Sequence, residues 1–434
     1  MASDWEIASL VEHCKKIGSG ATPRGGSSVY LEEGEITLIR SQNVYNDGFK
    51  RDGLVFITEE AAEKLKNVIV EENDILLNIT GDSVARVCMV DKQVLPARVN
   101  QHVSIIRPKE SSFNPLYLRY QLVSPHVQQL LLNYASAGAT RHALTKSMIE
   151  NLGIPKPDLD TQNNIAHILG SLDDKIELNS QMNETLEAMA QALFKSWFVD
   201  FDPVIDNALA AGNAIPDELL ERAEQRKGIE KKDNSDIQIL FPDEFEFTEE
   251  MGWIPKGWEL ISFGEFCDIK KGRNITKSTV SEGYIPVVAG GLKPAYYHNE
   301  SNVNAPVITV SASGANAGFV NLYYQDIWAS DCSYISENMS PFIFTTYSFL
   351  KYHQDKVFGL QQGAVQPHVY PKDLSRLNFV DSDESVKIVI EKNLNSYYEK
   401  IKFNEAQTEA LAKIRDTLLP KLMSGELRIP DDIF

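Results

Sequence analysis

The chain of 434 residues lacks several features that would assign it to common protein classes. It has no apolar run of the roughly eighteen residues that a membrane-spanning helix requires. Its first residues have neither the basic nor the apolar stretch of a secretory signal peptide. Its four cysteines are far apart and form no C-x-x-C pair, so zinc binding has little support. We therefore expect a cytoplasmic protein with reduced thiols and no bound metal.

Familiar catalytic motifs are also missing. There is no G-x-x-x-x-G-K-[S/T] loop for ATP phosphates and no Asn/Asp-Pro-Pro-aromatic signature of amino-methyltransferases. One nuclease-like pattern, Asp217 followed by Glu230 and Lys232, falls in a stretch typical of a charged helix, whereas metal-dependent nucleases hold their carboxylates on adjacent strands. We assign no catalytic residue and predict that the chain is not an enzyme. An activity assay on the purified chain alone would test the enzyme alternative.

The net charge of −19 is unevenly distributed. Residues 200–250 hold 15 acidic and 5 basic side chains, whereas residues 1–150 hold 18 and 16, and residues 251–380 hold 10 of each. An acidic protein is a poor match for nucleic acid as a whole, because phosphate binding needs Lys and Arg. The balanced charge of the two outer blocks nevertheless allows a local basic face on each.

The sequence contains a tandem duplication, which is the strongest internal signal that it offers. Residues 5–14 and 258–267 share Trp, Glu, Ser, Glu and Cys at matching positions. Residues 175–186 match residues 400–411 at a constant offset of 225. The chain therefore consists of a block and a helix, a connector, and a second block and helix.

A shorter motif supports the same duplication. Gly-Ala followed by His and Lys occurs at residues 138–146 and again at residues 363–372. This match predicts that His142 and His368 occupy corresponding places in the two blocks.

Two segments, 158–200 and 384–423, have the alternating steps of four and three between seam positions that are typical of a coiled coil. No proline occurs between 158 and 202 or between 372 and 419, so each helix can run for about 38 residues, which corresponds to roughly 57 Å. Both seams become polar at the same central steps, at Asn179 and at Asn404. We predict that the helices pair antiparallel with these two residues facing each other. The alternative is two unrelated helices, each packed on its own domain.

The two outer blocks have the patterns of α+β domains. Short β-rich runs at 36–39, 74–79, 103–106 and 306–310 alternate with turns rich in Gly and Asn. A helix is expected near 115–134, with a counterpart near 341–355. Between the blocks, residues 201–257 are acidic and are expected to form an irregular connector with a short helix near 216–227.

Polar residues suited to DNA readout recur in the expected loops of both blocks, because Arg, Lys, Asn and Gln side chains form paired hydrogen bonds with base edges. Each residue alone is more typical of an ordinary polar turn, but their repetition in duplicated order favours DNA binding. In the first block the candidates are Arg24, Arg40, Gln42, Asn43, Thr80, Arg86, Arg98, Asn100, Gln101, Arg141, His142 and Lys146. In the second block they are Lys270, Lys271, Arg273, Lys277, Lys293, Tyr297, Ser313, Asn316, Gln362, Gln366 and His368.

The end of the first helix is rich in aromatic residues, among them Phe194, Trp197 and Phe198. Aromatic side chains dominate the binding energy of protein interfaces, so these three are candidates for docking a partner protein. The alternative is that they pack the helix end onto a domain.

Several stretches resemble the specificity subunit of type I restriction-modification systems. The closest are LGSLDDKIELNSQMNETLEAMAQALFKSWFVDFDPV at 169–204, FPDEFEFTEEMGWIPKGWE at 241–259 and LLPKLMSGELRI at 418–429. In the first block, WEIASLVEHCKKIGSGATP, IRSQNV, NITGDSVARV and VNQHV resemble a target recognition domain of that family. The second block matches more loosely, as expected for a domain that reads its own sequence.

The resemblance implies a fold and an organisation. The fold would be α+β and pseudo-two-fold, with two target recognition domains separated by two long helices that form an antiparallel coiled coil. The domains are then a first recognition domain at 1–155, a helix at 158–200, an acidic connector at 201–257, a second recognition domain at 258–380, a helix at 384–423 and a tail at 424–434.

The resemblance also implies a function. The chain would bind a bipartite site in double-stranded DNA without being catalytic, and would dock two methyltransferase subunits and further restriction or translocase subunits. No cofactor is expected on this chain, because S-adenosylmethionine, ATP and Mg would belong to the partners. The alternatives are a coiled-coil scaffold that never touches DNA, or a specificity factor of a phage-defence system that only methylates.

Overall fold

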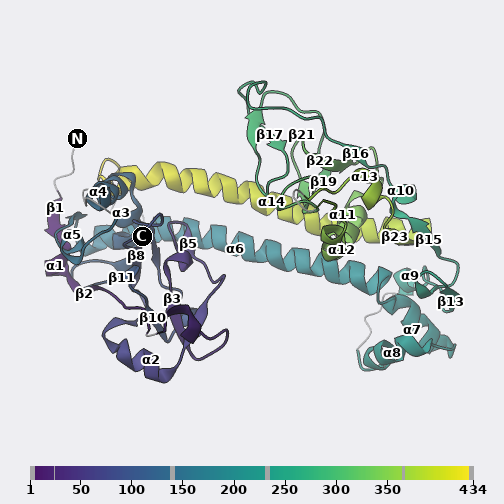
Figure 1. Cartoon of the computed structure of the whole chain (residues 1–434), viewed down its shortest axis with the longest axis horizontal. Helices are drawn as coiled ribbons and strands as arrows, with labels where there is room; N and C mark the ends of the chain where they lie inside the picture. The colour runs from purple at the N-terminus through teal and green to yellow at the C-terminus, as the bar shows by residue number, and fades with distance from the viewer. Residues whose placement is uncertain (1–4, 24, 137–141, 230–234, 364–366, 430–434) are drawn as a thin grey trace. The chain divides into compact units, whose positions relative to one another are not determined.

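A computed structural model describes the chain except for residues 1–4, 24, 137–141, 230–234, 364–366 and 430–434 (Figure 1). The chain divides into two compact units. Unit 1 comprises Met1–Leu178 and Gln407–Phe434, and unit 2 comprises Asn179–Ala406. Both units combine helices with sheets, which confirms the predicted α+β class. Among the described residues, no helix is long and apolar enough to cross a membrane.

The two predicted long helices are present. They are α6 (Leu159–Phe198) and α14 (Glu384–Met423), each of 40 residues, within two residues of the predicted ends. Unit 1 contains the start of α6 together with the end of α14, and unit 2 contains the other two halves. The helices therefore run antiparallel, as the sequence predicts.

The central polar steps of the seam meet inside unit 2. Asn179 and Asn404 are each 1% exposed. The Nδ2 atom of Asn179 donates to the backbone carbonyl of Asn404 over 3.4 Å, and Nδ2 of Asn404 donates to Oδ1 of Asn183 over 2.8 Å. The two residues thus face each other, and their amides continue the hydrogen bonding to the next polar step.

One seam position differs from the heptad pattern. Tyr398 is buried, whereas its neighbour Tyr397, which the pattern places in the seam, is only half-buried. The cause is α11 (Ile343–Tyr352), which packs on this face of α14. The ring of Phe344 stacks on Tyr398 with centroids 5.2 Å apart, and Ser348 Oγ lies 3.1 Å from the Tyr398 hydroxyl. The helix therefore packs on its partner helix and on its own domain at once.

Unit 1 contains two four-stranded sheets. The first is antiparallel, in the order β2 (Cys14–Ser19), β11 (Val103–Pro108), β8 (Ile75–Asn78) and β9 (Val87–Met89). The second has the order β6 (Val55–Ile57), β3 (Ile36–Ile39), β10 (Ala97–Val99) and β7 (Ile69–Val70), with β10 parallel to β3. Two short pairs join β1 (Glu6–Ser9) to β12 (Gly153–Lys156) and β4 (Val44–Tyr45) to β5 (Gly48–Phe49).

Strand β8 shows how alternation builds the core of unit 1. Side chains point to opposite faces of a strand in turn. Ile75 and Leu77 pack into the cluster that also holds Leu169 of α6, whereas Leu76 packs into a second cluster with Leu38 of β3. Both faces of this strand are buried, so its sequence is a continuous apolar run.

The helices of unit 1 outside the long pair are short. They are α1 (Leu10–His13), α2 (Glu59–Lys64), α3 (Pro115–Val123), α4 (Pro125–Ser136) and α5 (Lys146–Glu150), with 3-10 turns at Gly26–Val29, Ser41–Asn43, Lys66–Val68 and Lys92–Val94. The helical stretch predicted near 115–134 is confirmed, and it consists of two helices, α3 and α4. Pro125 disfavours helical geometry at the residue before it, and Ser124 accordingly has an extended ψ of 146°.

The sheets of unit 2 repeat those of unit 1. The four-stranded sheet has the order β16 (Lys270–Lys271), β22 (Cys332–Ser336), β19 (Val307–Ser311) and β20 (Val320–Tyr323). The second sheet has the order β18 (Tyr296–His298), β17 (Ile285–Val288) and β21 (Trp328–Ala329), with β21 parallel to β17. The pair β15 (Glu259–Ser262) and β23 (Asn378–Asp381) corresponds to β1 and β12. The helices are α10 (Phe263–Phe266), α11, α12 (Gln354–Gly359) and α13 (Pro371–Leu374).

The predicted irregular connector is also wrong, because most of it is folded into unit 2. It contains α7 (Asp202–Ala211), α8 (Leu220–Lys227), α9 (Ser235–Gln238) and a hairpin of β13 (Phe245–Thr248) with β14 (Gly252–Pro255). The helix expected near 216–227 is α8 with the 3-10 turn Asp217–Leu219 before it.

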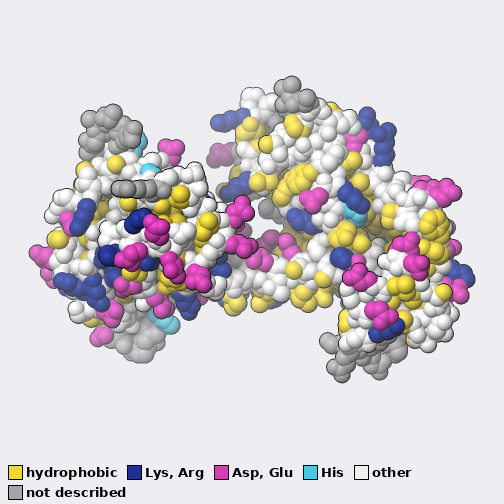
Figure 2. Space-filling model, turned by 60° about the horizontal axis from the view of Figure 1, so that its bottom comes forward, with side chains coloured by type: hydrophobic (Ala, Val, Ile, Leu, Met, Phe, Trp, Pro, Cys, Tyr) yellow, Lys and Arg dark blue, Asp and Glu magenta, His cyan; other side chains and the backbone are white. Residues whose placement is uncertain are grey.

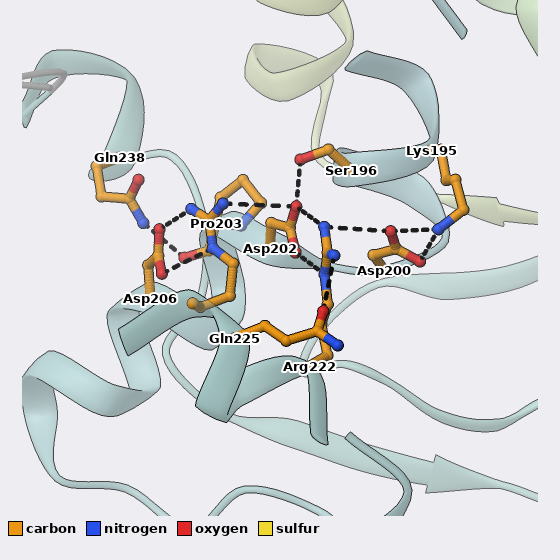
Figure 3. Close-up of polar contacts among 10 residues, drawn as sticks. Lys195, Ser196, Asp200, Asp202, Pro203, Asp206, Arg222, Gln225 and Gln238 are labelled. Atoms are coloured by element: carbon orange, nitrogen blue, oxygen red, sulfur yellow. Dashed lines mark hydrogen bonds and ion pairs between the residues drawn. The ribbon is translucent and has the colours of Figure 1, made fainter. Parts of the chain in front are cut away.

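Ion pairs fold the connector onto the end of α6 (Figure 3). Asp202 is 2% exposed, and both of its carboxylate oxygens accept hydrogen bonds from Arg222, each over 2.7 Å. Its Oδ2 also accepts from Ser196 Oγ of α6 over 2.7 Å. Asp206 pairs with Arg226 in the same way one helical turn further on. Two acidic residues of this segment, Asp202 and Asp206, are therefore buried against half-buried arginines and do not belong to a loose charged linker.

Candidate nucleic-acid interface

The turn between the last two strands of each four-stranded sheet has the same backbone in both units. In unit 1, the amide of Ala85 donates to the carbonyl of Asn78 over 2.8 Å. In unit 2, the amide of Gly318 donates to the carbonyl of Ser311 over 2.8 Å. We call residues 78–86 and 311–319 the recognition turns of the two units, because they contain Thr80, Arg86, Ser313 and Asn316 from the predicted DNA-contacting set.

Two positions in each recognition turn have a left-handed backbone. Gly81 and Gly314 have φ of 75° and 81°, and Ala85 and Gly318 have φ of 69° and 91°. A side chain at a positive φ is strained, so Ala85 holds a conformation that unit 2 assigns to glycine. These bends let the turn leave the sheet and re-enter it after a few residues.

A second segment backs each recognition turn. Thr80 forms a bridge with Ala143, and Ser313 forms the same bridge with His368. The predicted correspondence of His142 with His368 is therefore shifted by one residue. The carbonyl of His142 accepts from Gly81, whereas in unit 2 the carbonyl of Pro367 accepts from Gly314. His142 thus corresponds to Pro367, and only unit 1 has a histidine at this place.

Four of the predicted residues of unit 1 meet around one cavity of about 710 Å³. They come from three separate loops, and further residues of these loops complete the wall together with His102 from the turn between β10 and β11. The predicted residues are Gln42, Thr80, Arg86 and His142, and the others are Ser41, Tyr45, Gly81, Asp82, Ser83, His102 and Ala143. The fold thus brings residues that are up to about a hundred positions apart in sequence to one polar hollow.

Polar contacts order the side chains in this cavity. Thr80 Oγ1 lies 2.5 Å from Nδ1 of His102, and Gln101 Nε2 lies 2.8 Å from Nε2 of the same ring. The guanidinium carbon of Arg86 lies 4.5 Å from the centroid of the Tyr45 ring. Tyr45 was missed from the sequence, where the available signal was its position two residues after the predicted Asn43. His102 lies in the stretch VNQHV that resembles a target recognition domain.

Two predicted residues of unit 1 hold the loops instead of lining the cavity. Asn43 is fully buried, and its Nδ2 donates to the carbonyls of Lys50 and Asp52 over 2.9 and 3.2 Å. Asn100 is 5% exposed, and its Oδ1 accepts from the amide of His102 over 3.0 Å. Their amides fix the backbone from which the cavity side chains project.

The two other described arginines of the set point to backbone carbonyls. Arg98 donates to the carbonyls of Ala62 and Ala97 over 3.2 and 3.0 Å, and thus lies against α2. Arg40 donates to the carbonyl of Gly53 over 2.5 Å and lies over the ring of Tyr30 at 5.5 Å. Neither lines the cavity wall.

Lys146 lies in another part of unit 1. It borders a separate hollow of about 560 Å³ with Lys15 and Lys16 on β2, and its Nζ is 3.4 Å from Glu150. This group is a second basic region of the unit. Arg24 and Arg141, like Glu230 and Lys232 of the nuclease-like pattern and Gln366 of the second block, lie outside the described residues.

In unit 2 the recognition turn carries different chemistry. The Ser313 hydroxyl hydrogen-bonds the carboxylate of Asp331, where unit 1 has Thr80 against His102. Asn316 is half-buried in the turn, and His368 stacks on Tyr370 with centroids 5.8 Å apart. Gln362 pairs with His368 through its backbone and donates from Nε2 to Asp373 over 3.0 Å.

The basic candidates of unit 2 are exposed. They are Lys270, Lys271, Arg273, Lys277 and Lys293. Arg273 lies 6.0 Å over the Trp328 ring, whose Nε1 donates to the Arg273 carbonyl over 2.8 Å. Tyr297 is 56% exposed on the edge strand β18. On the face shown in Figure 2, Lys and Arg side chains lie among Asp and Glu side chains, so recognition there depends on local sites.

The three aromatic docking candidates lie in the core of unit 2. Phe194, Trp197 and Phe198 are 1%, 7% and 5% exposed. Trp197 packs edge-on against Phe241 at 4.9 Å, and Phe198 lies 5.5 Å from Trp258. Side chains buried in this way offer almost no surface to a partner. The structure therefore favours the alternative that they pack the helix end onto a domain.

Burial also suppresses the reactivity of the cysteines. Three buried cysteines form no disulfide bonds, and burial raises the pKa of each thiol to about 12. They are Cys88, Cys267 and Cys332. The thiolate is the form that attacks or binds metal, so these groups are unreactive at neutral pH. Within the described ranges, no group of three or more His, Cys, Asp or Glu side chains is placed to hold a metal ion.

The chain is similar to proteins of one family. It matches the family described as the type I restriction modification DNA specificity domain over residues 2–188 and 255–412. The HindI specificity subunit of Haemophilus influenzae is 26% identical, over 98% of this chain and 100% of that protein. The MjaIX specificity subunit of Methanocaldococcus jannaschii is 24% identical, over 99% of this chain and 94% of that protein. The crystal structure of an S subunit from M. genitalium shares the fold, with a TM-score of 0.58, 17% identity and 96% of each chain covered.

Proposed function

The chain belongs to the family of type I restriction-modification specificity subunits, and from that premise we propose that its two units each read one half of a bipartite site in double-stranded DNA. The observation that carries this proposal is the pair of recognition turns. One backbone frame occurs in both units, and its polar side chains differ between them. A duplicated frame with changed side chains is what reading two different sequences requires, because base identity is read by side-chain donors and acceptors.

We further propose that the chain is not catalytic and that it docks methyltransferase and restriction subunits. Two methyltransferase subunits would match the two units, one for each half-site. S-adenosylmethionine, ATP and Mg would then be bound by those partners. The lack of nucleotide-binding and methyltransferase motifs in the sequence supports this division of labour.

The experiment is a comparison of variants in the two units. The chain is co-expressed with its methyltransferase, and the methylated motif is read from the genome. Gln42→Ala in the unit 1 cavity should relax or abolish one half of the motif, and Ser313→Ala in the unit 2 turn should affect the other half. A lost base contact costs about 1–3 kcal/mol at one position, whereas a lost phosphate contact weakens all sequences alike.

Two results would contradict the proposal. If each variant alters both halves equally, the units do not read independently. If the complex shows no salt-dependent retention of DNA in a gel, the chain is a scaffold that does not touch DNA, since binding to phosphates releases counterions and weakens with salt. A surface variant far from both turns, such as Lys64→Ala, whose side chain pairs with Glu60 on α2, is the control and should leave the motif unchanged.

A further inference from the structure

We propose that Arg86 selects a guanine in the half-site read by unit 1, by donating two hydrogen bonds to N7 and O6 of that base. This inference rests on the proposed function of unit 1 and adds the identity of one base. It follows from the position, the orientation and the free hydrogen-bonding capacity of the Arg86 side chain, and from the residue that replaces it in unit 2.

The backbone of Arg86 is fixed at the end of the recognition turn. Its amide donates to the carbonyl of Ser83 over 3.2 Å, and its carbonyl accepts from the amide of Asn78 over 2.9 Å. The residue before it, Ala85, has the left-handed φ of 69° that turns the chain back into β9. The side chain therefore starts from a rigid point at the edge of the sheet and lines the cavity wall.

The guanidinium group is oriented by an aromatic ring. Its carbon lies 4.5 Å from the centroid of Tyr45, which belongs to β4. The loop after Tyr45 is tied to the same strand, because Asn46 Oδ1 accepts from the amide of Val87 over 2.8 Å. Stacking holds the plane of an arginine while leaving its N–H groups at the edge free to donate.

Among the described arginines of unit 1, Arg86 has neither the acidic partner of the ion-paired arginines nor the backbone-carbonyl acceptors that Arg40 and Arg98 have. Arg51, Arg107 and Arg119 form ion pairs with Asp91, Asp74 and Asp173 respectively. In the described part of the chain, no carboxylate lies within ion-pairing distance of Arg86, and its side chain is half-buried. A fixed, unpaired fork of donors is suited to a ligand with two neighbouring acceptors.

Guanine is the base that presents two acceptors side by side in the major groove, at N7 and O6. A phosphate also presents paired acceptors, but phosphate contacts carry no sequence information. The cavity favours a base, because Gln42, Asp82 and Ser83 line the wall together with Arg86 and offer both donors and acceptors, and the Asp82 carboxylate would repel a phosphate. Base identity is read by such a convergent set.

Unit 2 lacks this contact. The carbonyl of Phe319 accepts from the amide of Ser311 over 3.0 Å, so Phe319 occupies the place that Arg86 has in unit 1. A phenyl ring cannot donate to N7 or O6. The requirement for this guanine should therefore be confined to one half of the motif.

The experiment changes single atoms of the DNA. The methylated motif of the wild-type complex is determined first, and the half read by unit 1 is identified with Gln42→Ala. Binding of the complex with its methyltransferase is then measured on duplexes in which each guanine of that half is replaced by 7-deazaguanine, which lacks the N7 acceptor. One replacement should weaken wild-type binding by about 5-fold to 150-fold, and the same replacement should have no further effect on Arg86→Ala.

Arg86→Lys separates base from phosphate, because lysine keeps the charge but cannot form the paired hydrogen bonds. It should lose sensitivity to 7-deazaguanine as Arg86→Ala does, while keeping the salt dependence of the wild type. Arg51→Ala, which removes an arginine paired with Asp91, is the matched control and should keep both. Melting curves of all three variants confirm that unit 1 is folded.

Three results would overturn the inference. The first is a unit 1 half-site that contains no guanine. The second is an Arg86→Ala complex that still binds 7-deazaguanine DNA more weakly than guanine DNA. The third is an Arg86→Lys complex that keeps the full wild-type sensitivity to 7-deazaguanine. In each of these cases a bipartite motif with independent halves would leave the proposed function standing. A complex that binds no DNA, or whose halves change together, would remove the proposed function itself.

Discussion

The recognition turns of the two units share a backbone and differ in what they present. Unit 1 places Thr80 against His102 and adds Arg86 to a cavity that Asp82 also lines. Unit 2 places Ser313 against the carboxylate of Asp331, which accepts hydrogen bonds. The backbone hydrogen bonds of the two turns agree closely, so the duplicated part is the frame. The side chains that this frame carries differ between the two units.

The two units also differ in how α6 and α14 are held together. In unit 1, Asp173 of α6 accepts from Arg415 of α14 over 2.8 Å and from the Tyr120 hydroxyl over 2.6 Å. In unit 2 the seam is held by the asparagines, and the end of α6 is covered by aromatic rings and by the folded connector. The polar contacts between the long helices are therefore charged in unit 1 and uncharged in unit 2.

The largest expected effect breaks unit 2 alone. Trp197→Ala removes a large ring that is 7% exposed and should lower the free energy of unfolding of unit 2 by about 3–5 kcal/mol. Hydrogen exchange should show faster opening in 179–406 and little change in unit 1. Phe403→Ala, which truncates a ring 56% exposed on α14, is the control. A stable Trp197→Ala protein that fails to bind methyltransferase would instead support the docking alternative.

A smaller effect concerns the connector, which unit 1 does not have. Asp202→Asn leaves Arg222 and Arg226 without the charge that they surround, and should lower the free energy of unfolding of unit 2 by about 3 kcal/mol. The measurement is urea denaturation followed by tryptophan fluorescence. Glu224→Gln breaks an exposed ion pair with Lys227 on the same helix and should change stability by less than about 1 kcal/mol. If the two variants lower the free energy of unfolding equally, the buried network stabilises unit 2 no more than an exposed ion pair does.

The same carboxylate gives unit 2 a pH dependence. Burial alone would raise the pKa of Asp202. Hydrogen bonds from Arg222 and Ser196 together outweigh this effect, so the pKa lies below its usual value. The stabilisation that ionised Asp202 gives to unit 2 is therefore complete above the ordinary Asp pKa of about 3.9. It is lost as the pH falls through the lower pKa that this carboxyl group has in the folded state. The stability difference between wild type and Asp202→Asn should narrow below about pH 4. A constant difference from pH 7 to pH 3 would contradict this cause.

The smallest effect sharpens the comparison at the seam. Replacing both Asn179 and Asn404 by Leu removes buried polar groups from unit 2, and should raise its free energy of unfolding by up to about 1 kcal/mol while loosening the register of the helices. The checks are the melting temperature and the spacing of the two methylated half-sites. Lower stability in the double variant would mean that the asparagine hydrogen bonds outweigh the cost of burying them.

Patterns with a local cause were predictable from the sequence. The heptad steps located both long helices to within two residues, since one stripe of side chains must be buried along the whole helix. The connector was misread because its folding depends on pairs twenty residues apart, such as Asp202 with Arg222, and composition shows only the surplus of acid. The break between α3 and α4 follows from Pro125, which lies inside the predicted helical stretch 115–134 and disfavours helical geometry at Ser124.

The candidate site was predictable by residue type and not by role. Gln42, Thr80, Arg86 and His142 do converge, whereas Asn43 is of the same polar kind and holds the loop. An amide can bind a base or cap a backbone with the same atoms, and only the fold decides which groups it meets. Whether the converging residues contact DNA is still a prediction, which the variants above test.

The sharing of α14 between the units has a consequence for biosynthesis. The core of unit 1 is completed by Leu422 and Met423, and Gln121 donates to the Met423 carbonyl over 3.1 Å. All residues of unit 2 are synthesised before residue 407. At that point unit 1 still lacks the end of α14. Ile165 and Leu169 must wait for a segment made more than two hundred residues later. A chain truncated after residue 406 is therefore expected to protect unit 2 from protease and to leave unit 1 open to it.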